Sequence, residues 1–301
     1  MEDPEISKYN SSISDEITEI LSTLIFVTLE LSKVDDNTIN NWLNDKDAKI
    51  WKPYLNILRK RNPYILDPLV EEILIEKSAT GRSAWIRLFD ETSAALRFPF
   101  KNKSLTEAEI LNLLSDADPE TRKIAGKSLS EVLENNKRIF GMILNVISRD
   151  RFIEDNKRGF KRIMSSRNLD NDVEDEVVDK LVNTVDKAMP KLTHRYYKWK
   201  ANQFGQTKLD WWDRNAPLPH SSENLIKWSE AKDIILDSFS SFHQEISNLA
   251  ELFFKNNWID ASLRKGKASG AFAHPSVPSL HPYILVNYQG KIRDVMTLAH
   301  E

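Results

Sequence analysis

The chain has 301 residues, 41% of them hydrophobic, which is enough for one large domain or two of ordinary size. Its 42 Lys and Arg are mixed along the sequence with 45 Asp and Glu, so the formal net charge of -3 offers no basic field to hold a nucleic acid. The lack of cysteine excludes disulfides, iron–sulfur clusters and thiolate zinc sites, so a metal ion would have to be bound by His and carboxylate side chains.

The beginning of the chain argues against export and membrane insertion. The first residues, MEDPEISK, are acidic rather than basic. The most apolar early stretch, residues 20–29, is interrupted by Ser22, Thr23 and Thr28. We therefore expect neither a signal peptide nor a transmembrane span, and we expect a cytoplasmic protein without a membrane partner.

Residues 1–98 are predicted to form a series of helices. After Ser14-Asp15, apolar side chains recur at spacings of three and four residues, which predicts a long helix with one buried face. These side chains are Ile17, Ile20, Leu21, Leu24, Val27 and Leu31. Shorter helices are predicted after Asp36, over 50–61 before Asn62-Pro63, over 67–77 with Pro68 in the first turn, and over 85–96.

A polar segment, residues 99–103, is expected to act as a hinge. The sequence Ser104-Leu105-Thr106-Glu107 that follows has the pattern of a capping box, which would start the next helix. We therefore predict two domains: an N-terminal helical domain over 1–98 and a second domain over 104–301.

The second domain is also predicted to be helical until about residue 265. Asp118-Pro119 supplies an N-cap and a proline for the first turn of a helix. Residues 139–152 are apolar on more than one face, which predicts a central packed helix in which Gly141 permits close approach. Further helices are expected after Asp170-Asn171, over 193–200, after Ser221-Ser222-Glu223, and around Ile246, Leu249, Leu252 and Phe253.

Two of these segments could bind a ligand or could be structural. Residues 193–200 mix basic and aromatic side chains, a combination that can stack on and neutralise single-stranded nucleic acid. On an acidic protein, one short basic face is more often a solvated helix side, and we expect no nucleic-acid partner. Loop 210–219, DWWDRNAPLP, is dense in Trp and Pro, which usually anchor a loop and less often line a ligand groove. We assign this loop a structural role.

The composition changes near residue 265, where turn-forming glycine and proline become frequent. Residues 283–288 are rich in aromatic and β-branched side chains and are predicted to form a strand that pairs with residues 270–272. A Gln289-Gly290 turn then leads into a final helix. The predicted fold class is mainly α, a multi-helical architecture with a small β-sheet just before that last helix.

The last two residues, His300 and Glu301, lie at the end of the final helix. A zinc endopeptidase of the HExxH type needs a helix with two imidazoles one turn apart and a glutamate beside the first, which takes a proton from the metal-bound water. The chain encodes the first imidazole and the glutamate, and the second histidine would fall at position 304, beyond the last residue. A His-Glu pair alone arises often by chance, so its weight depends on the sequence around it.

Three segments near this pair occur in a specific order. Residues 266–272 are GKASGAF, residues 282–288 are PYILVNY and residues 297–301 are TLAHE. This order and spacing resembles the oligoendopeptidase F branch of the thimet oligopeptidase and oligoendopeptidase F family of zinc metallopeptidases. The similarity covers most of residues 15–301, although Trp212 stands where the family commonly has tyrosine.

The resemblance implies a metalloendopeptidase with a channel between two helical halves, one Zn2+ per complete enzyme, and short unstructured peptides as substrates. It implies that His300 is a zinc ligand and that Glu301 is the general base. The second histidine, a downstream glutamate ligand and the residues that stabilise the oxyanion are expected beyond residue 301. The chain is therefore expected to be an internal fragment that is inactive by itself, with apolar surface exposed around Val295, Met296 and Leu298.

Peptide substrates are expected at an exposed edge of the small sheet, where main-chain hydrogen bonds hold peptides of varied sequence. The residues assigned to substrate binding are Gly270, Ala271, Phe272, Tyr283, Asn287 and Tyr288. His274 and His281 are weaker candidates for further metal ligands, because each precedes a proline in a turn-rich loop. The other histidines, His194, His220 and His243, are assigned structural roles. The alternative function is a non-catalytic helical module that binds peptides or protein partners without zinc.

Overall fold

The computed structural model describes residues 4–219, 224–277 and 279–301. These residues divide between two compact units, and both units are mainly helical, which confirms the predicted fold class. The site unit contains Asp90–Asn136 and Tyr196–Glu301, and the helical unit contains the described part of Asp3–Phe89 and Lys137–Arg195. Over the described ranges, no helix combines the length and the apolar character needed to cross a bilayer.

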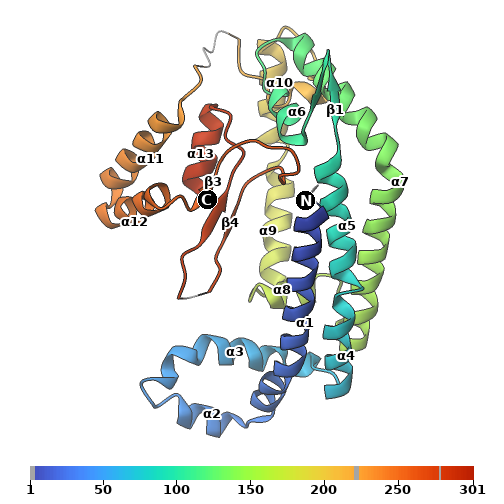
Figure 1. Ribbon diagram of the computed structural model, residues 1–301, viewed down its shortest axis with the longest axis vertical. Helices are drawn as coiled ribbons and strands as arrows, with labels where there is room; N and C mark the ends of the chain where they lie inside the picture. The colour runs from blue at the N-terminus through green and yellow to red at the C-terminus, as the bar shows by residue number, and fades with distance from the viewer. Residues whose placement is uncertain (1–3, 220–223, 278) are drawn as a thin grey trace. The chain divides into compact units, whose positions relative to one another are not determined.

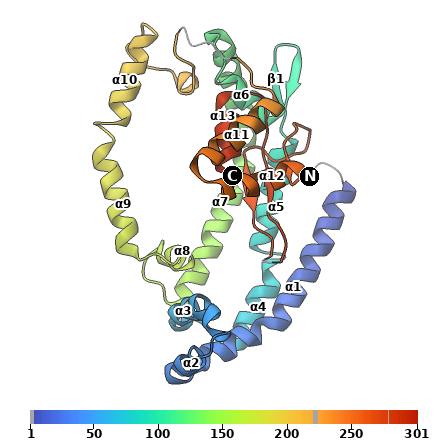
Figure 2. The ribbon, with the colours of Figure 1, turned by 90° about the vertical axis from the view of Figure 1, so that its left-hand side faces the viewer.

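The helical unit consists of helices joined by short turns (Figures 1 and 2). The α-helices in it are α1 (Pro4–Lys33), α2 (Asp36–Trp42), α3 (Lys52–Arg61), α4 (Pro68–Ser78), most of α5 (Arg82–Ala95), the second part of α7 (Pro119–Arg158), α8 (Ser165–Asp170) and α9 (Asp175–Ala188). Short 3-10 helices lie at Ala48–Trp51 and Asn62–Tyr64. Asp67 caps α4 by accepting the N–H of Leu69, and Pro68 occupies the first turn, as the sequence predicts.

Helix α1 begins at Pro4, well before its predicted start at Ser14-Asp15. The buried residues of this helix are Ser22 and Leu29, and the hydroxyl of Ser22 donates to Glu76 of α4 at 3.4 Å. The predicted apolar face, which includes Ile17, remains about half exposed. The prediction of a buried face is therefore wrong in the part of α1 that the structure describes, because α4 packs on a different side of the helix.

The middle of α7 is less enclosed than its apolar sequence predicts. Ile143 is buried, but Met142 and Leu144 beside it are exposed. A Cβ added to Gly141 would meet no described atom within 4 Å. The predicted close helix approach at Gly141 is therefore wrong, because the helix packs on the Ile143 side in the described part of the unit.

The Asp170-Asn171 pair ends a helix instead of starting one. Asn171 is the C-cap of α8, Asp172 adopts a φ of 51°, and α9 begins at Asp175. Ser165 and Asn168 of α8 donate side-chain hydrogen bonds to the carboxylate of Asp175. The turn between the two helices is therefore fixed by polar contacts that an apolar periodicity cannot reveal.

Arg158 joins α7 to α4 in the interior of the helical unit. Its two terminal nitrogens donate to the two oxygens of Glu71 at 2.6 and 2.9 Å, and its Nε donates to Glu154 at 2.8 Å. Burial by itself would raise the pKa of the Glu71 carboxyl, but hydrogen bonds from Arg158 and from the N–H of Leu66 hold this pKa below its usual value. This bidentate pair fixes the crossing of the two helices.

The site unit combines helices with two small sheets. Its elements are β1 (Phe98–Phe100), β2 (Lys103–Leu105), α6 (Glu107–Leu113), the first part of α7, most of α10 (Thr193–Gln203), a 3-10 turn (Trp211–Asp213), α11 (Trp228–Phe242), α12 (Gln244–Lys255), β3 (Ile259–Asp260), β4 (Phe272–His274), β5 (Tyr283–Leu285) and α13 (Ile292–His300). The predicted helix start at Ser221-Ser222-Glu223 lies outside the described ranges, and α11 begins at Trp228.

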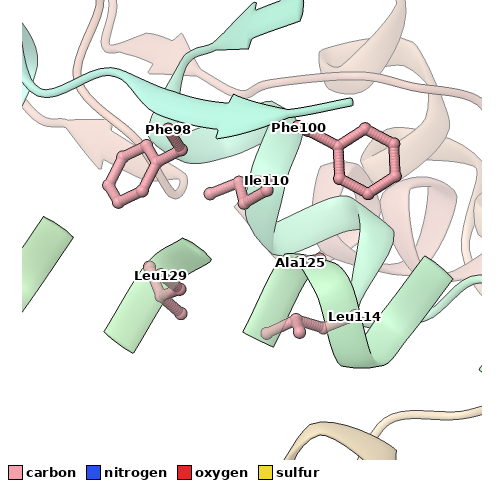
Figure 3. Close-up of a cluster of buried hydrophobic side chains, with 6 residues drawn as sticks. All are labelled: Phe98, Phe100, Ile110, Leu114, Ala125 and Leu129. Carbon is pink, nitrogen blue, oxygen red and sulfur yellow. The ribbon is translucent and has the colours of Figure 1, made fainter. Parts of the chain in front are cut away.

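A hydrophobic core, here the hairpin core, lies under β1 and β2 (Figure 3). It consists of Phe98, Phe100, Ile110, Leu114, Ala125 and Leu129. Phe98 and Phe100 are both buried and pair with Leu105 and Lys103 on the neighbouring strand. The polar hinge predicted at 99–103 is therefore wrong: the segment is a β-hairpin, because the two phenylalanines anchor it in the core.

Side-chain caps begin two helices of this unit, α6 and α7. The capping box is formed by Thr106 and Glu109, whose side chains accept each other's main-chain N–H at 3.4 and 2.7 Å. It lies two residues beyond the predicted box, because Ser104 belongs to β2. The N-cap at Asp118 is confirmed, since its carboxylate accepts the N–H of Thr121 at 3.0 Å at the start of α7.

The Trp- and Pro-rich loop 210–219 is anchored by a buried ion pair. Arg122 of α7 donates through Nε to Asp213 at 2.7 Å, and the side chains are 1% and 5% exposed. Arg122 also donates to two main-chain carbonyls before α7, at 2.8 and 2.9 Å. Trp212 packs against the hairpin core. The structural role predicted for this loop is confirmed.

Candidate active site

A three-stranded sheet precedes the last helix of the chain. Its strand order is β3-β5-β4, so that β5 is the central strand. β3 runs parallel to β5 and pairs Ile259 with Ile284, whereas β4 runs antiparallel to β5 and pairs Phe272 with Leu285. The predicted pairing between the strand after Pro282 and the chain around Phe272 is confirmed.

The central strand and the last helix share one core, here the site core, with α11. The site core consists of Ala231, Ile235, Ile284, Val286, Val295 and Leu298. The helices α11 and α12 pack against each other beside it (Figure 1). Val295 and Leu298 are thus buried, and of the three residues expected to be exposed only Met296 is exposed. That prediction is wrong for two residues because β5 and α11 cover the apolar side of α13.

The start of α13 is fixed by a glycine turn and a carboxylate. Gly290 has a φ of +91°, and a Cβ at this position would lie 3.1 Å from the carbonyl oxygen of Ile226. The carboxylate of Asp294 accepts the N–H groups of Gln289 at 2.9 Å and Lys291 at 3.0 Å. These bonds satisfy main-chain donors at the helix N-terminus and set the direction in which the helix leaves the sheet.

Tyr288 attaches this turn to the chain before α11. Its hydroxyl donates to the carbonyl of Ile226 at 2.8 Å, and its ring lies edge-on to Trp228. Burial raises the pKa of the Tyr288 hydroxyl, and the negative charges of Asp294 and Glu230 raise it further. The hydroxyl therefore remains a hydrogen-bond donor at neutral pH.

Lys267 lies where β3 and β5 end. Its side chain is 1% exposed, and its ammonium nitrogen has four oxygen neighbours at 2.6 to 3.1 Å. These are the carbonyls of Asp260, Ser262 and Val286 and the carboxylate of Asp260. Burial lowers the pKa of Lys267, while the hydrogen bond to Asp260 opposes that change.

Two further side chains fix the loop between β3 and β4. The amide of Asn287 donates to the carbonyls of Ala268 at 2.9 Å and Gly270 at 3.0 Å. The hydroxyl of Ser269 donates to Glu107 of α6 at 2.7 Å. The loop is therefore held from the strand side by Asn287 and from the helix side by α6.

The turn before α13 is also attached to α6. Gln289 donates through its amide to the carbonyl of Ala108 at 3.2 Å, and Lys291 donates through its ammonium to the carbonyl of Asn112 at 2.8 Å. Helix α6 thus contacts both the loop that leads into β4 and the turn that leads into α13. None of these contacts with α6 was anticipated from the sequence, because the partners are far apart along the chain.

His300 and Glu301 lie at the end of α13. The N–H of Glu301 donates to the carbonyl of Thr297 at 3.1 Å, so the helical hydrogen bonding continues to this residue. His300 is exposed and Glu301 is partly buried. An accessible imidazole with a carboxylate next to it on a rigid helix is the arrangement that zinc and a general base would require.

The donor set for a metal is incomplete within the described residues. They contain no group of three or more His, Cys, Asp and Glu side chains that could hold a metal ion. A catalytic zinc site uses three protein ligands, so the imidazole of His300 fits zinc by its chemistry but does not suffice alone.

The two weaker candidates for metal ligands, His281 and His274, lie in different surroundings. The ring of His281 stacks on Trp258 at a centroid distance of 3.6 Å, and Nδ1 of His281 contacts the carbonyl of Pro282. His274 is exposed on β4.

The residues assigned to substrate binding occupy different environments. Phe272 and Tyr283 are exposed on neighbouring strands, at 48% and 52% of their surface. Ala271 and Tyr288 pack against the site core. Asn287 holds the loop carbonyls described above, one of which belongs to Gly270, where φ is +85°. The structure thus brings Phe272 and Tyr283 to one exposed surface of the sheet, whereas Ala271 and Tyr288 pack toward the site core.

Comparison with known proteins places this site in a family. Residues 112–301 match the family described as Peptidase family M3, and residues 30–98 match the region described as Oligopeptidase F. The chain therefore belongs to peptidase family M3. Within this family it is oligoendopeptidase F-like.

Two relatives illustrate the similarity in sequence. The chain is 23% identical to oligopeptidase PepF of Bacillus subtilis over 300 residues, which is 97% of this chain and 44% of the relative. It is 28% identical to an oligoendopeptidase F homolog of Borreliella burgdorferi over 94% of this chain and 48% of the relative. The chain thus spans about half the length of the curated relatives it matches.

Solved structures show the same fold. A structure of PZ peptidase A with an inhibitor matches with a TM-score of 0.81 at 18% identity, covering 99% of this chain and 52% of that one. Oligoendopeptidase-F from Enterococcus faecium matches with a TM-score of 0.67 at 18% identity, covering 84% of this chain and 49% of that one. These neighbours agree with the mainly helical fold and its small sheets.

Proposed function

We propose that the chain supplies part of the active site of a zinc-dependent endopeptidase that hydrolyses short peptides. The observation that carries the proposal is the location of His300 and Glu301 at the accessible end of α13 in a chain of peptidase family M3. The helix is held by apolar burial on one side and by the Asp294 cap at its start. The two side chains therefore have a rigid support, which catalytic groups require.

The roles of the two residues follow from their chemistry. When bound, zinc would polarise the scissile carbonyl and lower the pKa of a water molecule. His300 would hold the metal through a ring nitrogen, together with protein ligands that the described residues do not supply. Glu301 would take a proton from the attacking water and deliver it to the leaving amine.

Substrate binding is proposed at the β4 edge of the sheet. β5 is the central strand, so β4 pairs with it on one side only, and its three residues are exposed. An extended peptide can add to such an edge through main-chain hydrogen bonds, which gives affinity without strict sequence preference. Phe272 and Tyr283 would contact substrate side chains, while Gly270, Ala271, Asn287 and Tyr288 would shape the edge from within the sheet.

The proposal is tested with the complete gene product and a short fluorogenic peptide. We expect hydrolysis that a zinc chelator abolishes and that added zinc restores. Glu301→Gln should retain zinc, measured by atomic absorption, and should lose hydrolysis, while His300→Ala should lose both. Unchanged turnover by Glu301→Gln would contradict the role of the glutamate. We propose a cytoplasmic location and peptides as the substrates.

A second candidate function is peptide binding without catalysis, which the exposed β4 edge also favours. It predicts that the 301-residue chain binds an unstructured peptide equally well with and without a chelator. Equilibrium binding by fluorescence anisotropy separates the two functions. Zinc-dependent hydrolysis by the complete gene product would exclude the second candidate.

A further inference from the structure

Lys267 is among the most enclosed charged groups in the site unit, and the proposed mechanism does not use it. Its side chain is 1% exposed, and its ammonium lies within 3.1 Å of four oxygen atoms. An ammonium has three N–H donors, so four oxygens occupy them fully. A buried charge is tolerated only when it is paired and hydrogen-bonded, and Asp260 supplies the opposite charge at 3.1 Å.

The four oxygens belong to three residues at or just beyond the ends of β3 and β5. Asp260 ends β3, Ser262 lies in the loop that follows β3, and Val286 directly follows β5. The bond to the Val286 carbonyl is the shortest, at 2.6 Å. Lys267 itself belongs to the loop that leads into β4. One nitrogen therefore connects the ends of two strands to the chain that enters the third.

The Lys267 contacts are continued by Asn287, the residue after Val286. Its amide donates to the carbonyls of Ala268 and Gly270, which are the next parts of the same loop. Gly270 has a φ of +85°, and β4 begins two residues later at Phe272. The path of the chain into the β4 edge is thus fixed against the segment that leads from β5 into α13.

We propose that Lys267 is a positioning residue of the peptidase: it sets the placement of the β4 edge relative to α13. This inference rests on the proposed function, in which β4 binds the peptide and α13 carries His300 and Glu301. Lys267 touches neither of these residues in the described hydrogen bonds, so it would act through the sheet. A displacement of about 1 Å between bound substrate and catalytic groups lowers turnover by about 100-fold.

The first test is kinetic and uses the complete gene product. Lys267→Met removes the donors and keeps the length of the side chain, and we expect kcat to fall by about 100-fold with KM and zinc content changed less than about threefold. Arg264→Met is the matched control, because Arg264 also pairs with Asp260 but is 56% exposed. We expect the control to keep its kcat. A Lys267→Met variant with the kcat of the wild type would overturn the proposal.

A chemical rescue separates positioning from general damage. The 301 residues contain no cysteine, so Lys267→Cys introduces a single thiol into them. Alkylation of the unfolded variant with 2-bromoethylamine, followed by refolding, creates a lysine analogue, and alkylation with bromoethane creates an apolar side chain. The wild type is treated in parallel. We expect the aminoethyl form to recover kcat and the ethyl form to remain impaired; equal kcat values for the two forms would refute the role of the ammonium.

A third measurement does not depend on activity. In the 301-residue chain we expect Lys267→Met to accelerate amide hydrogen exchange in residues 268–274 while exchange in α13 stays as in the wild type. Equal acceleration throughout the site unit would mean a merely structural role and would overturn the proposal.

Should Lys267→Met fail to fold, Lys267→Gln, which keeps two N–H donors, is judged by the same criteria. Absence of hydrolysis in the wild type would reject the proposed function, and the exchange experiment would then decide the inference separately.

Discussion

Arg122 and Asp213 form a buried ion pair with an Nε to Oδ1 distance of 2.7 Å. Removing the carboxylate by Asp213→Ala would leave the guanidinium buried without its counter-charge, which costs about 3 to 5 kcal/mol. We therefore expect the free energy of unfolding to fall by that amount in urea denaturation followed by circular dichroism. The control is Asp210→Ala in the same loop, where the side chain is exposed and the change should stay within about 0.5 kcal/mol. Equal effects of the two substitutions would show that the pair does not hold the loop.

The Glu71–Arg158 pair should make stability depend on pH. The pKa of Glu71 is lowered in the folded state, so the stabilisation is fully present above the unfolded value near 4.5 and is lost as pH falls through the folded value. We expect the unfolding free energy of the wild type minus that of Glu71→Gln to be constant near neutral pH and to shrink below about pH 4.5.

The matched control for this pH dependence is Glu72→Gln, at the exposed neighbouring position. Urea titrations at several pH values between 3 and 7 provide the measurement. A difference between wild type and Glu71→Gln that does not change over this range would contradict the role of the pair.

Two glycines should respond oppositely to alanine. Gly290 has a φ of +91° and a Cβ there would lie 3.1 Å from the carbonyl oxygen of Ile226, so Gly290→Ala should destabilise the chain by about 1 to 3 kcal/mol. Gly141 lies inside α7 with no described atom within 4 Å of an added Cβ, so Gly141→Ala should stabilise it by about 0.5 to 1 kcal/mol. Thermal unfolding of both variants checks the signs, and a stabilised Gly290→Ala would be inconsistent with the turn described here.

Asn287 has two proposed roles that kinetics can separate. Its amide donates to two loop carbonyls, so Asn287→Asp, which keeps the shape but places a carboxylate against them, should lower kcat and destabilise the loop by about 1 to 3 kcal/mol. A residue that binds substrate directly would instead raise KM at constant kcat. Steady-state kinetics of the complete gene product distinguish these results. A raised KM with normal stability would assign Asn287 to the substrate.

Capping residues and prolines at helix ends made much of the helical framework predictable from the sequence. The Asp118-Pro119 and Asp67-Pro68 pairs start helices as expected, and Asn62-Pro63 follows the end of α3. The sheet before α13 was predicted from strand-forming residues and turn glycines. Whether a helix face is buried was less predictable, because burial of Ile17 depends on which side of α1 meets α4. Periodicity identifies the apolar face but does not identify its partner.

The parts of the site that were missed depend on contacts distant in sequence. β3 has no sequence signal, because its two residues, Ile259–Asp260, are too few to show an alternation and form a strand only by pairing with β5. Lys267 lies within the segment 266–272, but the sequence alone does not predict a role for it. A lysine between two glycines in a turn-rich segment is a weak signal, and its partners lie up to 19 residues away. The attachment of the site to α6 had no sequence signal at all.

The order of the strands constrains how the sheet can assemble. β5 is the last of the three strands to be synthesised, yet it lies between the other two. On a ribosome, β3 and β4 therefore have no strand partner in this sheet until residues 283–285 have emerged. Both pair with β5, and α13 follows β5 after only a short turn. The helix that carries His300 thus acquires its support only after all three strands have emerged, so the order of synthesis delays the folding of the sheet and of α13 until β5 is present.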